Sequence, residues 1–144
     1  MTNRLLFAVA LAGALVLQIG SITVAAPADA QQVIANTYRA GGVIAKVQVA
    51  FDAGDWPLLR SYVDQYVAMM RSVTVQVKDL SARGVVAGSA FEAVQQATLK
   101  HMTTLRKLHG TAPAKEVKDL LARAIEASQS AYDASGQAIA KTER

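Results

Sequence analysis

The strongest pattern in the sequence is a heptad spacing of apolar positions between residues 56 and 84. Apolar side chains recur there at alternating intervals of four and three residues, namely Leu59, Val63, Tyr66, Met70, Val73, Val77 and Leu80. This spacing places them along one face of an α-helix. Asp55 is suited to cap its first turn, where Pro57 is tolerated, and Gly84 is typical of a helix end. The pattern predicts a long helix from about Asp55 to Arg83.

Two later segments also have helical spacing. The first runs from Ser89 to His109 and has its apolar positions at Phe91, Val94, Met102, Leu105 and Leu108. Ser89 and Glu92 have the spacing of a capping box, which predicts where this helix starts. The second segment follows Pro113 and has its apolar positions at Val117, Leu120, Leu121, Ala124, Ile125, Ala131, Tyr132, Ala138 and Ile139. Both segments are predicted to be amphipathic helices.

The segment from Gln31 to Ala53 has an ambiguous pattern. Its residues Val43, Ala45, Val47, Val49 and Phe51 alternate as in a strand. No second strand is predicted with which it could pair, so we expect a helix. Gly41 and Gly42 each disfavour a helix by about 1 kcal/mol relative to alanine. We therefore expect a helix that ends at Gly54. Whether it is continuous, kinked or broken at the glycine pair is left open by the sequence.

Short linkers separate these four helical segments. Long amphipathic helices joined by short linkers are expected to pack as antiparallel neighbours. The sequence therefore predicts an all-α fold, an antiparallel four-helix bundle-like domain.

The N-terminal segment has the features of a secretory signal peptide. Arg4 precedes an uninterrupted apolar run from Leu5 to Leu17, and small residues around Ala28 and Ala30 form A-x-A sites. We expect residues 1–30 to be cleaved after Ala30, which leaves a single helical domain of residues 31–144 in the periplasm or outside the cell. The alternative is a leader that is retained, with residues 5–28 as an anchor in the inner membrane.

Composition excludes several classes of function. The chain has no Cys, so disulfides, zinc–thiolate sites, iron–sulfur clusters and cysteine nucleophiles are excluded. It carries 15 Lys and Arg against 11 Asp and Glu, which gives a net charge of +4. These cations are dispersed along the chain, whereas nucleic-acid binding needs them clustered on one face beside a recognition motif. We expect no nucleic-acid partner. A membrane contact is expected only if the leader is retained.

No known catalytic motif is present in the sequence. It contains no nucleophile elbow, phosphate-binding loop or H-E-x-x-H pair. Asp64 and Asp79 fall beside the apolar seam of their helix and are expected to face solvent. We therefore predict no catalytic residue, no bound cofactor and no enzymatic activity.

His101 is the residue with the most open interpretation. It falls on the apolar side of its predicted helix, together with Phe91, Val94, Thr98, Leu105 and Leu108. With Met69, Met70 or Met102, its imidazole is a candidate ligand for copper(I) or haem. The alternative is a core histidine that is hydrogen-bonded to a hydroxyl group, such as that of Thr98 or a tyrosine.

Several short motifs together resemble a family of exported bacterial helical domains of unknown function. They lie between residues 43 and 138 and comprise Ala50–Asp55, Leu58–Tyr62, Ala97–Leu105, Pro113 and Ala124–Ser128. The resemblance implies a helical fold and export, and it implies no site residue.

These observations predict a non-enzymatic interaction or scaffold module of the bacterial envelope. Its partner is expected to be an envelope protein or a second copy of the chain, because a heptad seam can also pair between chains. The alternative is a periplasmic metal- or haem-binding bundle that uses His101 with methionines.

Overall fold

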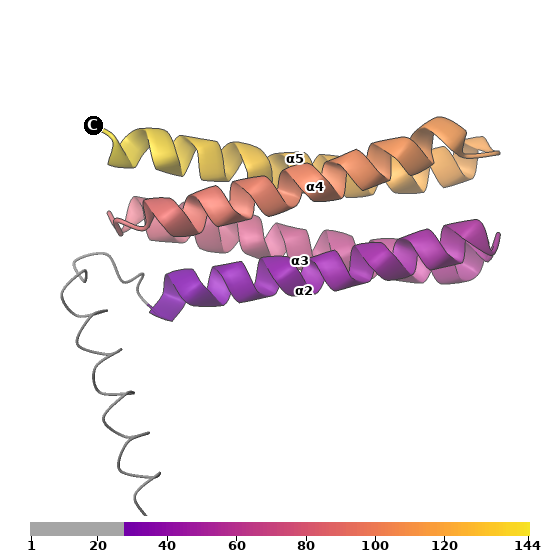
Figure 1. Cartoon of the computed structure of the whole chain (residues 1–144), viewed down its shortest axis with the longest axis horizontal. Helices are drawn as coiled ribbons and strands as arrows, with labels where there is room; N and C mark the ends of the chain where they lie inside the picture. The colour runs from indigo at the N-terminus through magenta and orange to yellow at the C-terminus, as the bar shows by residue number, and fades with distance from the viewer. Residues whose placement is uncertain (1–27) are drawn as a thin grey trace, which may run out of the picture.

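The computed structural model describes residues 28–144, which form a bundle of four helices (Figure 1). They are α2 (Ala28–Asp52), α3 (Trp56–Ala82), α4 (Gly88–Thr111) and α5 (Lys115–Thr142). The predicted all-α four-helix bundle is confirmed. The leader up to residue 27, and with it nearly all of the predicted anchor of residues 5–28, lies outside the described residues. Within residues 28–144, no helix combines the length and the apolar character needed to cross a membrane.

α2 shows that the ambiguous segment is a single helix, which continues through Gly41 and Gly42. Its buried positions follow the helical period and not the strand period. Val43 and Val47 are buried, whereas Val49, which shared their alternating pattern, is 68% exposed. The helix ends just before Gly54, whose positive φ of 67° is easily adopted only by glycine.

α3 matches its sequence prediction closely. The side chain of Asp55 caps the helix by accepting a hydrogen bond from the backbone N–H of Leu58 at 3.1 Å, and Pro57 lies in the first turn. All seven residues of the predicted seam are buried, with exposed fractions of 2% or less. Gly84, with a φ of 71°, follows the helix end.

The predicted capping box at the start of α4 is wrong. The capping position is Ala87, which has no side-chain capping bond, and Ser89 already lies within the first turn. The backbone carbonyl of Ala87 accepts the N–H groups of Ala90 and Phe91 at 2.9 and 3.0 Å. The Ala87 side chain is buried in the core, so this helix begins at a packed residue without a side-chain cap.

The four helices form two antiparallel hairpins stacked as two layers, α2 with α3 and α4 with α5 (Figure 1). Between the layers α2 packs against α4, and α3 packs against α5. Asp64 of α3 contacts Arg123 of α5, and further along both helices Ser81 contacts Lys141. The contacts follow the same order along both helices, so α3 and α5 run parallel.

The expectation that short linkers produce spatial neighbours is therefore wrong for α3 and α4, which lie across a diagonal of the bundle. Helix axes packed about 9 Å apart place diagonal partners about 13 Å apart. Five residues, from Arg83 to Ala87, can span about 16 Å when extended. The linker is thus long enough to cross the end of the bundle.

The bundle core is apolar except for a few hydroxyl groups and one imidazole. Four of the hydroxyls donate to a carbonyl one turn earlier in their own helix, namely those of Thr37, Thr74, Thr98 and Ser135. Such bonds satisfy the side chain without linking two helices. The remaining buried polar groups, on Tyr66, His101 and Ser128, bond between helices instead.

Candidate functional site

A polar centre lies inside the bundle and joins three of its helices. The phenol oxygen of Tyr66 on α3 is 3.0 Å from Nδ1 of His101 on α4. The same oxygen is hydrogen-bonded to the hydroxyl of Ser128 on α5. All three side chains are buried. This polar centre connects α3 to α4 across the diagonal, where the helix backbones themselves do not pack closely.

The opposite edge of the imidazole faces the fourth helix, α2. A Cβ atom placed on Gly41 would lie 3.1 Å from Nε2 of His101, closer than nine in ten real contacts of this kind. The Tyr66 and His101 rings meet edge to face, with their centroids 5.6 Å apart. Gly41 therefore leaves the room that the imidazole occupies between α2 and α4.

Burial controls the protonation of the polar centre. Burial lowers the pKa of His101 to about 4, and burial raises the pKa of the Tyr66 phenol well above its ordinary value. Both groups are therefore uncharged at neutral pH. Two proton arrangements satisfy them: Ser128 donates to Tyr66 and Tyr66 to His101, or His101 donates to Tyr66 and Tyr66 to Ser128.

His101 was open to two interpretations, a core histidine bonded to a hydroxyl group and a metal or haem ligand acting with methionines. Its hydroxyl partner is a tyrosine, as the core interpretation expects, whereas Thr98 bonds to the carbonyl of Val94. The three methionines lie in different surroundings. Met70 is in the core, Met69 lines a surface hollow with Asn36 and Arg39, and the sulfur of Met102 accepts a bond from Arg106 at 3.9 Å.

Residues 28–144 contain no group of three or more His, Asp or Glu side chains arranged to hold a metal ion. A site built from one histidine and thioethers stays a prediction. The prediction for Asp64 and Asp79 is confirmed, since both face solvent in ion pairs with Arg123 and Arg83 at 2.9 and 3.0 Å. Exposed pairs of this kind contribute about 1 kcal/mol or less.

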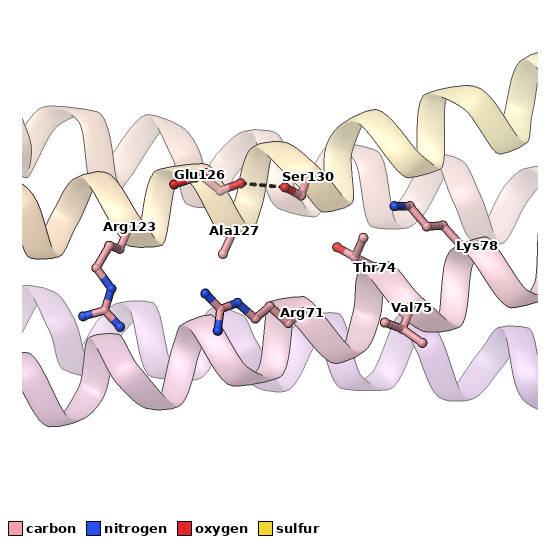
Figure 2. A pocket seen from close by; sticks show the side chains of 8 residues that line it. All are labelled: Arg71, Thr74, Val75, Lys78, Arg123, Glu126, Ala127 and Ser130. Carbon is pink, nitrogen blue, oxygen red and sulfur yellow. Dashed lines mark hydrogen bonds between the residues drawn. The ribbon is translucent and has the colours of Figure 1, made fainter.

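A site that the sequence analysis did not identify lies on the surface between α3 and α5. It is a hollow of about 410 Å³, here called the α3/α5 groove, and it is lined by Arg71, Thr74, Val75, Lys78, Arg123, Glu126, Ala127 and Ser130. Figure 2 shows Arg71 and Lys78 extending from α3 toward α5, and Arg123 reaching from α5 toward α3. The groove thus brings three cations together from both walls.

Two of these cations are unpaired. In the described part of the chain, neither Arg71 nor Lys78 has an ion-pair or hydrogen-bond partner, while Arg123 pairs with Asp64 at the edge of the groove. The hydroxyls of Thr74 and Ser130 donate to backbone carbonyls of their own helices. The N–H donors that the groove offers to a ligand are therefore cationic.

A second hollow of about 380 Å³ lies further along the same two helices. It is lined by Trp56, Pro57, Arg60, Ala114, Glu116, Val117 and Leu120. Because α3 and α5 run parallel, the Asp64–Arg123 pair lies between this hollow and the α3/α5 groove. The spacing of Arg71 and Lys78 is visible in the sequence, but the contribution of Arg123 depends on how α5 packs against α3.

No known protein indicates the function of this chain by similarity. The chain matches no protein-family model, no curated protein and no solved structure.

Proposed function

We propose that this chain is an exported helical bundle that works by contact, as an interaction or scaffold module of the bacterial envelope without catalytic activity. The observation that carries the proposal is the closed polar centre. Tyr66, His101 and Ser128 satisfy one another inside the bundle, and none of them lines the α3/α5 groove, the second hollow at Trp56 or the hollow at Met69.

Catalysis requires a nucleophile or base that meets substrate in an accessible pocket. Here the Ser128 hydroxyl bonds to the Tyr66 phenol and is fully buried, so it is not placed to meet a substrate in these hollows. His101 is enclosed between Tyr66 and Gly41. The chemistry of these groups therefore supports an architectural role, whereas the charged surface between helices supports a role in recognition.

Export is supported by the N-terminal sequence alone. The apolar run after Arg4 and the A-x-A sites near Ala30 are typical of a cleaved leader. A mature chain that begins at Gln31 would lack Asp29, which pairs with Arg83 at 3.2 Å, and would lack the buried Ala30. Arg83 would keep its pair with Asp79.

Site-specific photo-crosslinking in living bacteria tests the proposal. A photoreactive phenylalanine derivative is introduced at Tyr38, Val75 or Leu99, which are exposed apolar positions on α2, α3 and α4. We expect the protein in the envelope fraction and at least one position to give a discrete crosslinked product. Recovery of the protein from the cytoplasm, or no product from any of the three positions, would contradict the proposal.

A further inference from the structure

We infer that the α3/α5 groove binds an acidic segment of a partner protein, whose carboxylates pair with Arg71 and Lys78. This inference rests on the proposed function, because it identifies the contact surface of the module and the chemistry of its partner. The partner class follows from charge, from shape and from what the groove lacks.

Charge is the first argument. Arg71, Lys78 and Arg123 approach the hollow from both walls, against the single carboxylate of Glu126 (Figure 2). Arg71 and Lys78 have no acidic partner among residues 28–144, and a bound anion would relieve the repulsion between these like charges. Arg71 and Lys78 are seven residues apart, so they are about 10 Å apart along the helix axis. On an extended segment in the polyproline II conformation, carboxylates three residues apart share one face and lie about 9 Å apart, which matches that separation.

Shape is the second argument. The exposed Val75 and the small Ala127 lie in the lining between the cations. The methylene stems of arginine and lysine add further apolar surface. A lining that mixes cations with apolar groups suits a peptide that carries both carboxylates and apolar side chains, more than it suits a small inorganic anion.

The groove lacks features that other anionic partners require. Binding to an anionic membrane uses a face rich in large apolar side chains, such as Trp, Phe and Leu. Binding to single-stranded nucleic acid uses aromatic stacking. The lining contains no aromatic residue, and Val75 is its largest apolar side chain. Glu126 would also repel a continuous anionic surface.

The second hollow suggests how long the segment is. Arg60 lines that hollow, and it precedes Lys78 by 18 residues on α3. This separation corresponds to about 27 Å along the helix, which about eight extended residues would span. A segment of that length would pass the Asp64–Arg123 pair and reach Arg60.

Fluorescence anisotropy with a labelled octaglutamate peptide tests the inference on the full mature chain. The double charge reversal Arg71→Glu/Lys78→Glu is expected to weaken binding at least about tenfold, because it replaces two attractive contacts by two repulsive ones. The matched control is Lys100→Glu/Lys107→Glu, which makes the same charge change at exposed positions seven residues apart on α4. It should weaken binding by less than about threefold, through long-range charge alone.

Several outcomes would overturn the inference. Equal losses in the two double variants would show that binding follows only net charge, and no loss in either would place the contact elsewhere. The conservative exchange Arg71→Lys/Lys78→Arg should retain binding. Phosphatidylglycerol vesicles provide the remaining comparison: if the groove variant loses vesicle binding but keeps peptide binding, the partner is a membrane surface.

Crosslinking in cells separates failure of the inference from failure of the proposed function. The inference predicts a product from a photoreactive group at Val75, and that product should disappear when Arg71 and Lys78 are reversed. A product from Leu99 alone would overturn the inference and leave the contact module standing. The absence of products at every position would contradict the proposed function itself.

Discussion

The polar centre and the α3/α5 groove both gather polar side chains from neighbouring helices, but they differ in where their partners come from. Inside the bundle, Tyr66 is bonded to both His101 and Ser128. In the groove, Arg71 and Lys78 find no partner among residues 28–144. Polar groups that the chain satisfies itself define its architecture, whereas those it leaves unsatisfied on an open surface are available to another molecule.

The two regions should therefore respond to mutation in opposite ways. A buried polar group that loses its partner costs about 1–3 kcal/mol, because water cannot replace that partner. A surface substitution is usually within about 0.5 kcal/mol of neutral. Changes at the polar centre should affect stability, and changes in the groove should affect binding.

The largest effect is expected from acidification of the polar centre. The pKa of His101 is lowered to about 4 in the folded state, against about 6.5 in the unfolded chain. The unfolded state therefore takes up the proton first as the pH falls below about 6.5. The stabilisation is complete above that pH and is lost toward pH 4. We expect the free energy of unfolding to fall by about 2 kcal/mol between pH 7 and pH 5.

Urea denaturation at a series of pH values measures this decline. His101→Gln should remove most of it, whatever the stability of that variant at pH 7. His109→Gln is the control and should keep the decline, because His109 lies in the last turn of α4 outside the buried core. If the wild type and His101→Gln lost stability in parallel, the titration would belong to another group.

The next effect is the loss of the central hydroxyl in Tyr66→Phe. The substitution leaves Nδ1 of His101 and the hydroxyl of Ser128 without their shared partner. We expect a loss of about 1–3 kcal/mol in the free energy of unfolding. Tyr38→Phe removes the same atom from a side chain that is 63% exposed, and it should change stability by less than about 0.5 kcal/mol. Equal effects of the two variants would show that the polar centre contributes nothing specific.

A smaller effect, with opposite signs at adjacent positions, is expected for the glycine pair. The Cβ atom that Gly42→Ala adds has no neighbouring atom within 4 Å. The substitution should therefore stabilise α2 by up to about 1 kcal/mol through helix propensity. Gly41→Ala would press on the imidazole of His101. The expected cost of overpacking, about 1–3 kcal/mol, exceeds that gain. Thermal denaturation of the two variants should shift in opposite directions, and a gain in both would mean that His101 moves aside freely.

The glycine pair also shows how far the fold could be predicted from the sequence. Each helix has its own apolar stripe, and Asp55 and Gly84 mark boundaries by local chemistry, so the helices could be recognised one at a time. Gly41 and Gly42 suggested only a weakness in the first helix. Their difference depends on the neighbouring helix, because one faces His101 and the other faces open space.

The candidate sites were predictable only in part, for the same reason. Helical spacing placed His101 on an apolar face and left two interpretations open, a metal or haem ligand and a core histidine with a hydroxyl partner. It did not identify Tyr66, because that contact crosses a diagonal between helices that are consecutive in the chain. In the groove, Arg71 and Lys78 share a face in any helix. Arg123 joins them only because α5 packs parallel to α3.

The smallest effect is expected for Asp64→Asn, which tests the boundary between satisfied and unsatisfied charge. Asp64 pairs with Arg123 at the edge of the α3/α5 groove. Neutralising it leaves Arg123 as a third unpaired cation, while the loss of an exposed pair costs about 1 kcal/mol or less. We expect octaglutamate to bind about threefold more tightly, which corresponds to one additional exposed charge contact.

The control is Asp79→Asn, which removes the same charge beside Arg83, whose ion pairs are with Asp29 and Asp79. It should leave the affinity nearly unchanged, because Arg83 does not line the groove. If both substitutions tightened binding equally, the peptide would be sensing net charge, and the groove would lose its distinction from the rest of the surface.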